Sequence, residues 1–179
     1  MSTFTKALLL LFNVLLFSPC YGIQAPEHDS WNVPNCSSFA EYQKDKNSYI
    51  KMPVIGYSLL LRPANEVRSR KVNDVDYVLH VFSYGPTAQR SVMQGWFGPY
   101  AADRSAREKF KLKSSSFTER WARIGEDKVL DSQGQTTDGK HWRYLDLGSS
   151  SVYYEDASRE AAGVFDSMLA KMCYEMWKL

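Results

Sequence analysis

The chain has 179 residues, of which 44% are hydrophobic and 14% aromatic. This composition is typical of a folded globular protein and excludes an intrinsically disordered one. Lys and Arg number 22 and Asp and Glu number 20, so the formal net charge is +2. A general polyanion binder needs a basic excess to displace counterions, so the charge balance argues against nucleic acid as a partner.

The first 22 residues are typical of a cleavable secretory signal peptide. Lys6 precedes an apolar run from Ala7 to Phe17. Pro19 then breaks the helix, and small residues, Cys20 and Gly22, lie three and one positions before a cut after Gly22. This is the three-part pattern of export signals. A transmembrane anchor would need about 20 apolar residues, nearly twice this run. Lipid anchoring at Cys20 is the less favoured alternative, because Pro19 and the residues before it do not match a lipidation site. We therefore expect a secreted or periplasmic protein without a transmembrane helix in its mature chain.

Beyond this leader, the sequence predicts one folded domain with an N-terminal arm. Residues 23–48 contain two prolines and few periodic apolar positions, which favours an extended arm with a short helix over residues 37–46. Residues 49–179 contain no stretch rich in Gly, Ser or Pro that is long enough to be a linker. This second segment is therefore expected to form a single α+β domain.

Two cysteines, Cys36 and Cys173, would remain after cleavage of the leader. In an exported domain, two cysteines near opposite ends of the chain are most simply joined as a disulfide. Closing a loop of about 138 residues would remove on the order of 5 kcal/mol of unfolded-state entropy. Two unpaired thiols are the alternative. A metal site is not expected, because the chain lacks clustered histidines to complete a ligand set.

The middle of the chain has the composition and spacing of β-strands. Segments rich in β-branched and aromatic residues, bounded by Gly, Pro or short turns, predict strands over residues 57–62, 76–84, 91–97, 140–147 and 151–154. Residues 103–128 are ambiguous, because their first part fits a helix while residues 109–113 alternate like an edge strand. A sheet of about five strands is the expected result.

The end of the chain predicts a long amphipathic helix. Apolar residues recur every three or four positions from Arg159 to Trp177, which places them on one helix face. Asp156 or Ser158 could cap its start. The predicted fold is therefore α+β: an antiparallel sheet of about five strands packed against a C-terminal amphipathic helix.

No sequence pattern specifies a catalytic, cofactor or metal site. The chain has no Gly-x-Ser-x-Gly elbow, no His-Glu-x-x-His and no phosphate-binding glycine loop, so no cofactor is expected. The main candidate binding surface is aromatic: Trp96, Phe97 and Tyr100 lie between glycines and a proline and could form a platform for a sugar, a peptide or an apolar ligand. The alternative is that these aromatic side chains cover the core. His80 and His141 are further candidates for the same surface.

Two further patterns have both a functional and an ordinary interpretation. Seven basic residues form a local charge asymmetry: Arg104, Arg107, Lys109, Lys111, Lys113, Arg120 and Arg123. A solvated face is the favoured interpretation, and weak contact with an anionic surface is the alternative. Asn35-Cys36-Ser37 matches the N-glycosylation pattern, which matters in a eukaryotic secretory pathway.

These observations favour a small exported domain that is not an enzyme and that binds a ligand or an envelope or extracellular protein. The alternative is a secreted hydrolase whose site is assembled from dispersed residues such as His80, His141 and Asp138.

Overall fold

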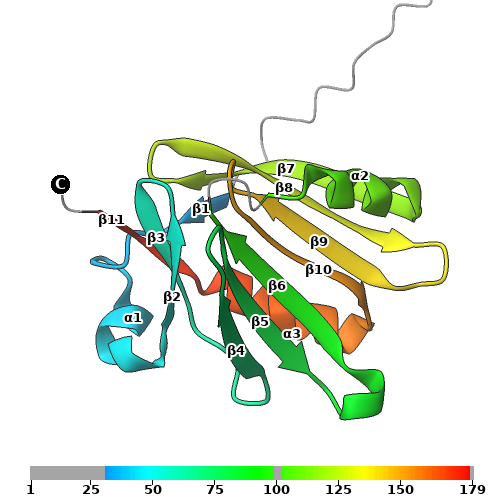
Figure 1. Cartoon of the computed structure of the whole chain (residues 1–179), viewed down its shortest axis with the longest axis horizontal. Helices are drawn as coiled ribbons and strands as arrows, with labels where there is room; N and C mark the ends of the chain where they lie inside the picture. Colours follow the sequence, from blue (N-terminus) through cyan, green and yellow to red (C-terminus); the bar gives the residue numbers. More distant parts are fainter. Residues whose placement is uncertain (1–30, 99–101, 178–179) are drawn as a thin grey trace, which may run out of the picture.

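The computed structural model describes residues 31–98 and 102–177. Within these ranges the chain forms eleven strands in two sheets and three short α-helices (Figure 1). The predicted signal peptide and Tyr100 lie outside the described residues.

A large mixed sheet of eight strands is the frame of the fold. Its strand order is β1-β7-β8-β9-β10-β6-β5-β4. Neighbouring strands are antiparallel, except that β1 runs parallel to β7. The strands are β1 (Trp31–Val33), β4 (Arg68–Asn73), β5 (Val78–Tyr84), β6 (Ser91–Phe97), β7 (Ser114–Ile124), β8 (Asp127–Thr136), β9 (His141–Asp146) and β10 (Ser151–Ala157).

A second sheet and the helices complete the structure. The small sheet has the order β11-β3-β2 and is antiparallel throughout. Its strands are β2 (Ile50–Val54), β3 (Tyr57–Leu61) and β11 (Cys173–Met176). The helices are α1 (Ala40–Lys44), α2 (Arg104–Leu112) and α3 (Arg159–Ala170). Side chains of Asp103 and Ser158 cap the starts of α2 and α3, as their oxygens accept hydrogen bonds from backbone N–H groups of the first turn.

The two faces of the large sheet have different coverings because side chains alternate along each strand. Leu145 of β9 belongs to the main core, together with Leu59 of the small sheet and Phe165 of α3. Its neighbour Tyr144 points the other way and packs against Phe110 of α2. We call these sides the α3 face and the α2 face.

The predicted disulfide between Cys36 and Cys173 is present. Both cysteines are completely buried. The backbone N–H of Cys36 also donates to the carbonyl of Tyr174 at 2.9 Å, so the arm is attached to β11 by a covalent bond and by hydrogen bonding. A disulfide is consistent with an oxidising compartment outside the cytoplasm. Among the helices that the structure describes, none has the length and apolar character that a membrane span requires.

The α+β arrangement is confirmed, but the prediction of an antiparallel sheet of about five strands is wrong. The five predicted strands are present as β3, β5, β6, β9 and β10. The prediction missed six others, including β4, β7 and β8. Five of the six residues of β4 and six of the eleven residues of β7 are solvent-exposed. The apolar residues of β8 are Val129 and Leu130, which are adjacent. All three strands therefore lack the sustained apolar alternation that identifies a half-buried strand.

The predicted C-terminal helix from Arg159 to Trp177 is also wrong in extent. α3 ends at Ala170, and the chain then continues as β11, which pairs with β3. Met172 is buried in the core and fits the helical spacing by coincidence. Hydrogen bonding to β3 and the disulfide at Cys173 stabilise this segment as a strand. Tertiary contacts therefore override the local helical periodicity.

Candidate functional site

An open, polar depression of about 310 Å³ lies on the α3 face, over one end of β7, β8 and β9. Most of its lining side chains carry hydroxyl, amide, imidazole or carboxylate groups. The residues that matter for its chemistry are Ser116, Thr118, Gln133, Gln135, His141 and Asp166.

The strand register brings five of these residues together. Ser116 lies opposite Gln135, and Thr118 lies opposite Gln133. Gln135 in turn lies opposite His141. Residues that are opposite or two apart in an antiparallel sheet point to the same side. The five side chains therefore form one patch on the sheet surface.

Most of this patch is free to bond a ligand. The side chains of Ser116, Thr118, Gln133 and His141 make no hydrogen bond within residues 31–98 and 102–177, whereas the Gln135 amide donates to the carbonyl of Gly139 at 3.3 Å. Hydroxyl and amide groups offer both donors and acceptors, and a neutral imidazole offers one of each. The patch can therefore bond a ligand rich in hydroxyl groups from several directions.

Gly134 is a structural requirement at the base of the depression. A Cβ atom at this position would lie 2.6 Å from the carbonyl oxygen of Ser116 and 2.9 Å from Cε2 of Trp142. Trp142 packs below it on the α2 face, where its indole N–H donates to the hydroxyl of Ser114 at 2.7 Å. A glycine within a strand often marks such a close approach.

Asp131, next to the depression, is completely buried at the centre of a charged network. Arg143 donates to both of its carboxylate oxygens, at 2.8 and 2.7 Å. Arg120 and the indole N–H of Trp31 donate to Oδ2 at 2.9 and 2.8 Å. Burial on its own raises the pKa of Asp131, but the bonds and charges of Arg143 and Arg120 outweigh it and hold the pKa below its ordinary value. The carboxylate is therefore ionised and links β1, β7, β8 and β9.

Asp166 of α3 connects this network to the depression. Its Oδ1 accepts hydrogen bonds from Nη1 of Arg143 at 2.9 Å and from the hydroxyl of Tyr154 at 3.0 Å. Its side chain is 41% exposed and lines the depression. Two arginines and two aspartates thus balance one another, so this network brings no net charge to the site.

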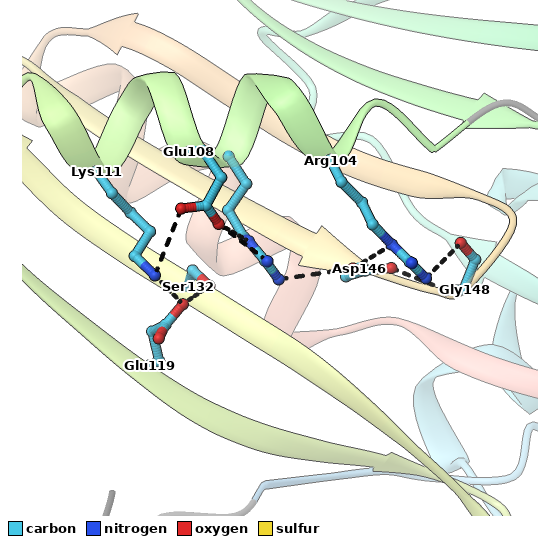
Figure 2. A network of polar contacts seen from close by, with 8 residues as sticks. Arg104, Glu108, Lys111, Glu119, Ser132, Asp146 and Gly148 are labelled. Carbon is cyan, nitrogen blue, oxygen red and sulfur yellow. Dashed lines mark hydrogen bonds and ion pairs between the residues drawn. The ribbon is translucent and has the colours of Figure 1, made fainter. Parts of the chain in front are cut away.

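A second polar network lies on the α2 face and holds α2 against the sheet (Figure 2). Arg104 and Arg107 approach Asp146 of β9 at 3.3 and 3.7 Å. Lys111 pairs with Glu119 of β7 at 3.2 Å. With Arg120, which pairs with Asp131, four of the seven basic residues that the sequence singled out have carboxylate partners from the sheet. This pairing reduces the charge available to an anionic surface. Contact with such a surface stays a prediction.

Trp96 and Phe97, the two predicted aromatic residues within the described ranges, lie on opposite faces of the sheet. Trp96 is half-buried on the α2 face, where its indole N–H donates to Gln94 at 2.9 Å and its ring packs 4.9 Å from that of Tyr77. Phe97 points to the α3 face and is part of the core. These two neighbours therefore do not share one platform.

The two candidate histidines are also far apart. His80 is on β5 and His141 is on β9, with β6 and β10 between them. Three inter-strand steps amount to about 14 Å. Asp138 lies in the turn between β8 and β9, bonded by the hydroxyl of Thr136. His141 is the one predicted site residue that lines the depression. The sequence offers no signal for Gln133 or Thr118, because polar residues on an exposed strand face are ordinary.

His80 is a buried histidine in an apolar environment. It is 4% exposed, its ring lies 5.9 Å from that of Phe97, and its Nε2 has no hydrogen-bond partner among the described residues. Burial, followed by the positive charge of Lys71, lowers the pKa of His80 from 6.5 to about 4. The imidazole is therefore neutral at physiological pH.

This histidine is expected to make the protein sensitive to mild acid. The imidazole of His80 binds a proton near pH 6.5 in the unfolded chain and near pH 4 in the folded protein. Protonation therefore favours the unfolded chain: the free energy of unfolding is at its full value above pH 6.5 and falls as the pH drops towards 4. The expected loss is on the order of 3 kcal/mol. Urea unfolding at pH 7, 5.5 and 4.5 measures it, with His80→Phe as the control. A wild-type protein that loses no more stability than the variant would contradict this assignment.

Comparison of the chain with protein-family models, with curated proteins and with solved structures found no match. Among the described residues, no group of three His, Cys, Asp or Glu side chains is placed to hold a metal ion. The functional argument therefore rests on the geometry and chemistry of the depression.

Proposed function

We propose that the protein is an exported, non-enzymatic domain that binds a small neutral polar ligand, such as a saccharide, in the depression on its α3 face. The observation that carries this proposal is the patch of unbonded hydroxyl, amide and imidazole groups at Thr118, Gln133 and His141. A volume of about 310 Å³ lies at the lower end of the range for small-molecule sites.

The charge balance favours a neutral ligand over an ionic one. Arg143 and Arg120 are offset by Asp131 and Asp166, so an anion or a cation would find no unpaired counter-charge in this network. Asp166 can still accept a hydrogen bond from a ligand hydroxyl, and a bond to an ionised acceptor is stronger than one between neutral groups.

The carboxylates around the depression support binding rather than glycoside hydrolysis. Hydrolysis of this kind ordinarily uses two carboxyl groups on either side of the scissile bond. Asp166 is the one carboxylate among the described residues that line the depression, and its Oδ1 already accepts bonds from Arg143 and Tyr154.

Titration with a panel of neutral mono- and disaccharides, followed by NMR of backbone amides, tests the proposal. We expect at least one sugar to shift the amide signals of β7, β8 and β9. Gln133→Ala and His141→Ala should each weaken its binding by about tenfold, since each removes one or two hydrogen bonds.

Gln89→Ala is the matched control, because Gln89 is exposed in the turn between β5 and β6 and lies outside the depression. This variant should bind as the wild type does. The proposal fails if no sugar in the panel binds, or if Gln133→Ala and Gln89→Ala bind it equally well. Breakdown of a sugar during the titration would favour the hydrolase alternative.

A further inference from the structure

β4 is the end strand of the large sheet, and its outer edge is open. It pairs with β5 on one side, and the strand order places no other strand beside it in the described part of the chain. Five of its six residues are exposed, and the sixth, Val72, is partly exposed. Such an edge presents unpaired N–H and C=O groups to solvent and can act as a template for another strand.

The other sheet edges are protected in ways that β4 is not. Within the described ranges β1 contributes three residues, and β2 contains Pro53. The outer side of β11 is occupied by the arm, since Asn35 forms a bridge with Tyr174. Short length, proline and covering segments are common ways to prevent edge pairing. β4 has six residues, no proline, and a pairing with β5 without a register shift.

The hydrogen bonding of the β4–β5 hairpin identifies the groups on the open edge. The N–H of Asp74 donates to the carbonyl of Tyr77 at 2.9 Å. Hydrogen-bonded and non-hydrogen-bonded pairs alternate along an antiparallel ladder. The N–H and C=O groups of Ser69, Lys71 and Asn73 therefore point away from β5, towards solvent.

The open edge is strongly basic. Arg68, Arg70 and Lys71 lie on β4 and form no ion pair with any residue of the described ranges. Arg70 lies opposite Val81 and Lys71 lies opposite His80, so the positive charges lie on both faces of the strand. A second copy of β4 would be repelled by this charge, whereas a strand with acidic side chains would be attracted.

We propose that β4 binds an extended, acidic segment of a partner protein as an added ninth strand. The backbone groups of Ser69, Lys71 and Asn73 supply the hydrogen bonds, and the basic side chains select acidic residues of the partner. Addition of a strand to an open edge is a known mode of peptide recognition. This surface is separate from the depression and does not depend on the ligand proposed there.

A ten-residue peptide of alternating Glu and Val is the probe. Its binding is followed by fluorescence anisotropy, and the amide hydrogen exchange of β4 is measured with the peptide present. We expect saturable binding, with exchange at Ser69, Lys71 and Asn73 slowed by more than about tenfold. The peptide with Lys in place of Glu should not bind.

Two variants at one position separate backbone pairing from charge attraction. Lys71→Ala and Lys71→Pro remove the same charge, but the proline also removes an N–H that points outward, which an edge strand tolerates. We expect Lys71→Pro to bind about tenfold more weakly than Lys71→Ala. Should the proline variant not fold, the same comparison is made with a peptide N-methylated at alternate residues. Gln133→Ala should bind the peptide as the wild type does.

Four outcomes would overturn the proposal. The first is that the acidic peptide does not bind. The second is equal binding by Lys71→Pro and Lys71→Ala, which would mean charge attraction alone. The third is that heparin binds as tightly as the acidic peptide and neither slows the hydrogen exchange of the β4 amides, which would indicate a surface for polyanions in general. The fourth is self-association through β4 in sedimentation experiments, which would make a second copy the occupant.

Discussion

Replacing Asp131 by alanine is expected to lower the free energy of unfolding by about 3–5 kcal/mol, the usual cost of removing one partner from a buried ion pair. Asp131 is completely buried, and the Arg143 side chain beside it is 7% exposed. Without Asp131, Arg143 loses both oxygens that accept its Nε and Nη2 donors and retains Asp166 alone. Urea unfolding measured by circular dichroism at pH 7 gives the value.

A double variant shows whether the stability lost in Asp131→Ala comes from leaving Arg143 without its partner or from the loss of side-chain packing. Asp131→Leu with Arg143→Met removes both charges and keeps apolar volume. Replacing a buried pair by apolar side chains is often close to neutral, so we expect the double variant to be more stable than Asp131→Ala. The partners that remain, Arg120 and Asp166, are one-third and two-fifths exposed and can be hydrated. A loss below 1 kcal/mol in Asp131→Ala would contradict the central role given to this carboxylate.

Removing the disulfide is expected to cost about 2–4 kcal/mol. Cys36 and Cys173 are 137 positions apart, so the bond restricts most of the unfolded chain. The double variant Cys36→Ala with Cys173→Ala, compared with wild type in urea, measures the effect. Reduction of the wild type with dithiothreitol should lower its stability to that of the variant. If reduced and oxidised wild type unfold at the same urea concentration, the bond does not contribute as argued.

The sequence identified the strands that bury apolar side chains on at least one face of a sheet. β5 and β6 are rich in aromatic and β-branched residues because they cross the core, and both were predicted. β4, with the sequence Arg68-Ser-Arg-Lys-Val-Asn73, is exposed on both faces and resembles a loop. Strands of this kind are defined by their neighbours, and the pairing of neighbours is not visible in a local pattern.

The candidate site was predictable in one residue only. His141 was singled out as a histidine, but its companions Gln133 and Thr118 come from strands that had not been predicted as strands. Gly134 indicates a close backbone approach only once β8 is known to be a strand, because the rule applies to a glycine in a strand interior. The ion pair between Asp131 and Arg143 depends on the register of β8 and β9, and no spacing rule along the chain predicts that register.

The N-terminal arm determines when the fold can be completed. Trp31 contacts Asp131, 100 positions later, and Cys36 is joined to Cys173, 137 positions later. Contacts of such high sequence separation form slowly, because the loop-closure entropy is lost before they are gained. During synthesis, the large sheet therefore cannot be completed before Ala157 has been added, and the covalent ring cannot close before Cys173. The export proposed above would require the chain to cross a membrane while unfolded. This delay would keep the chain unfolded long enough for translocation.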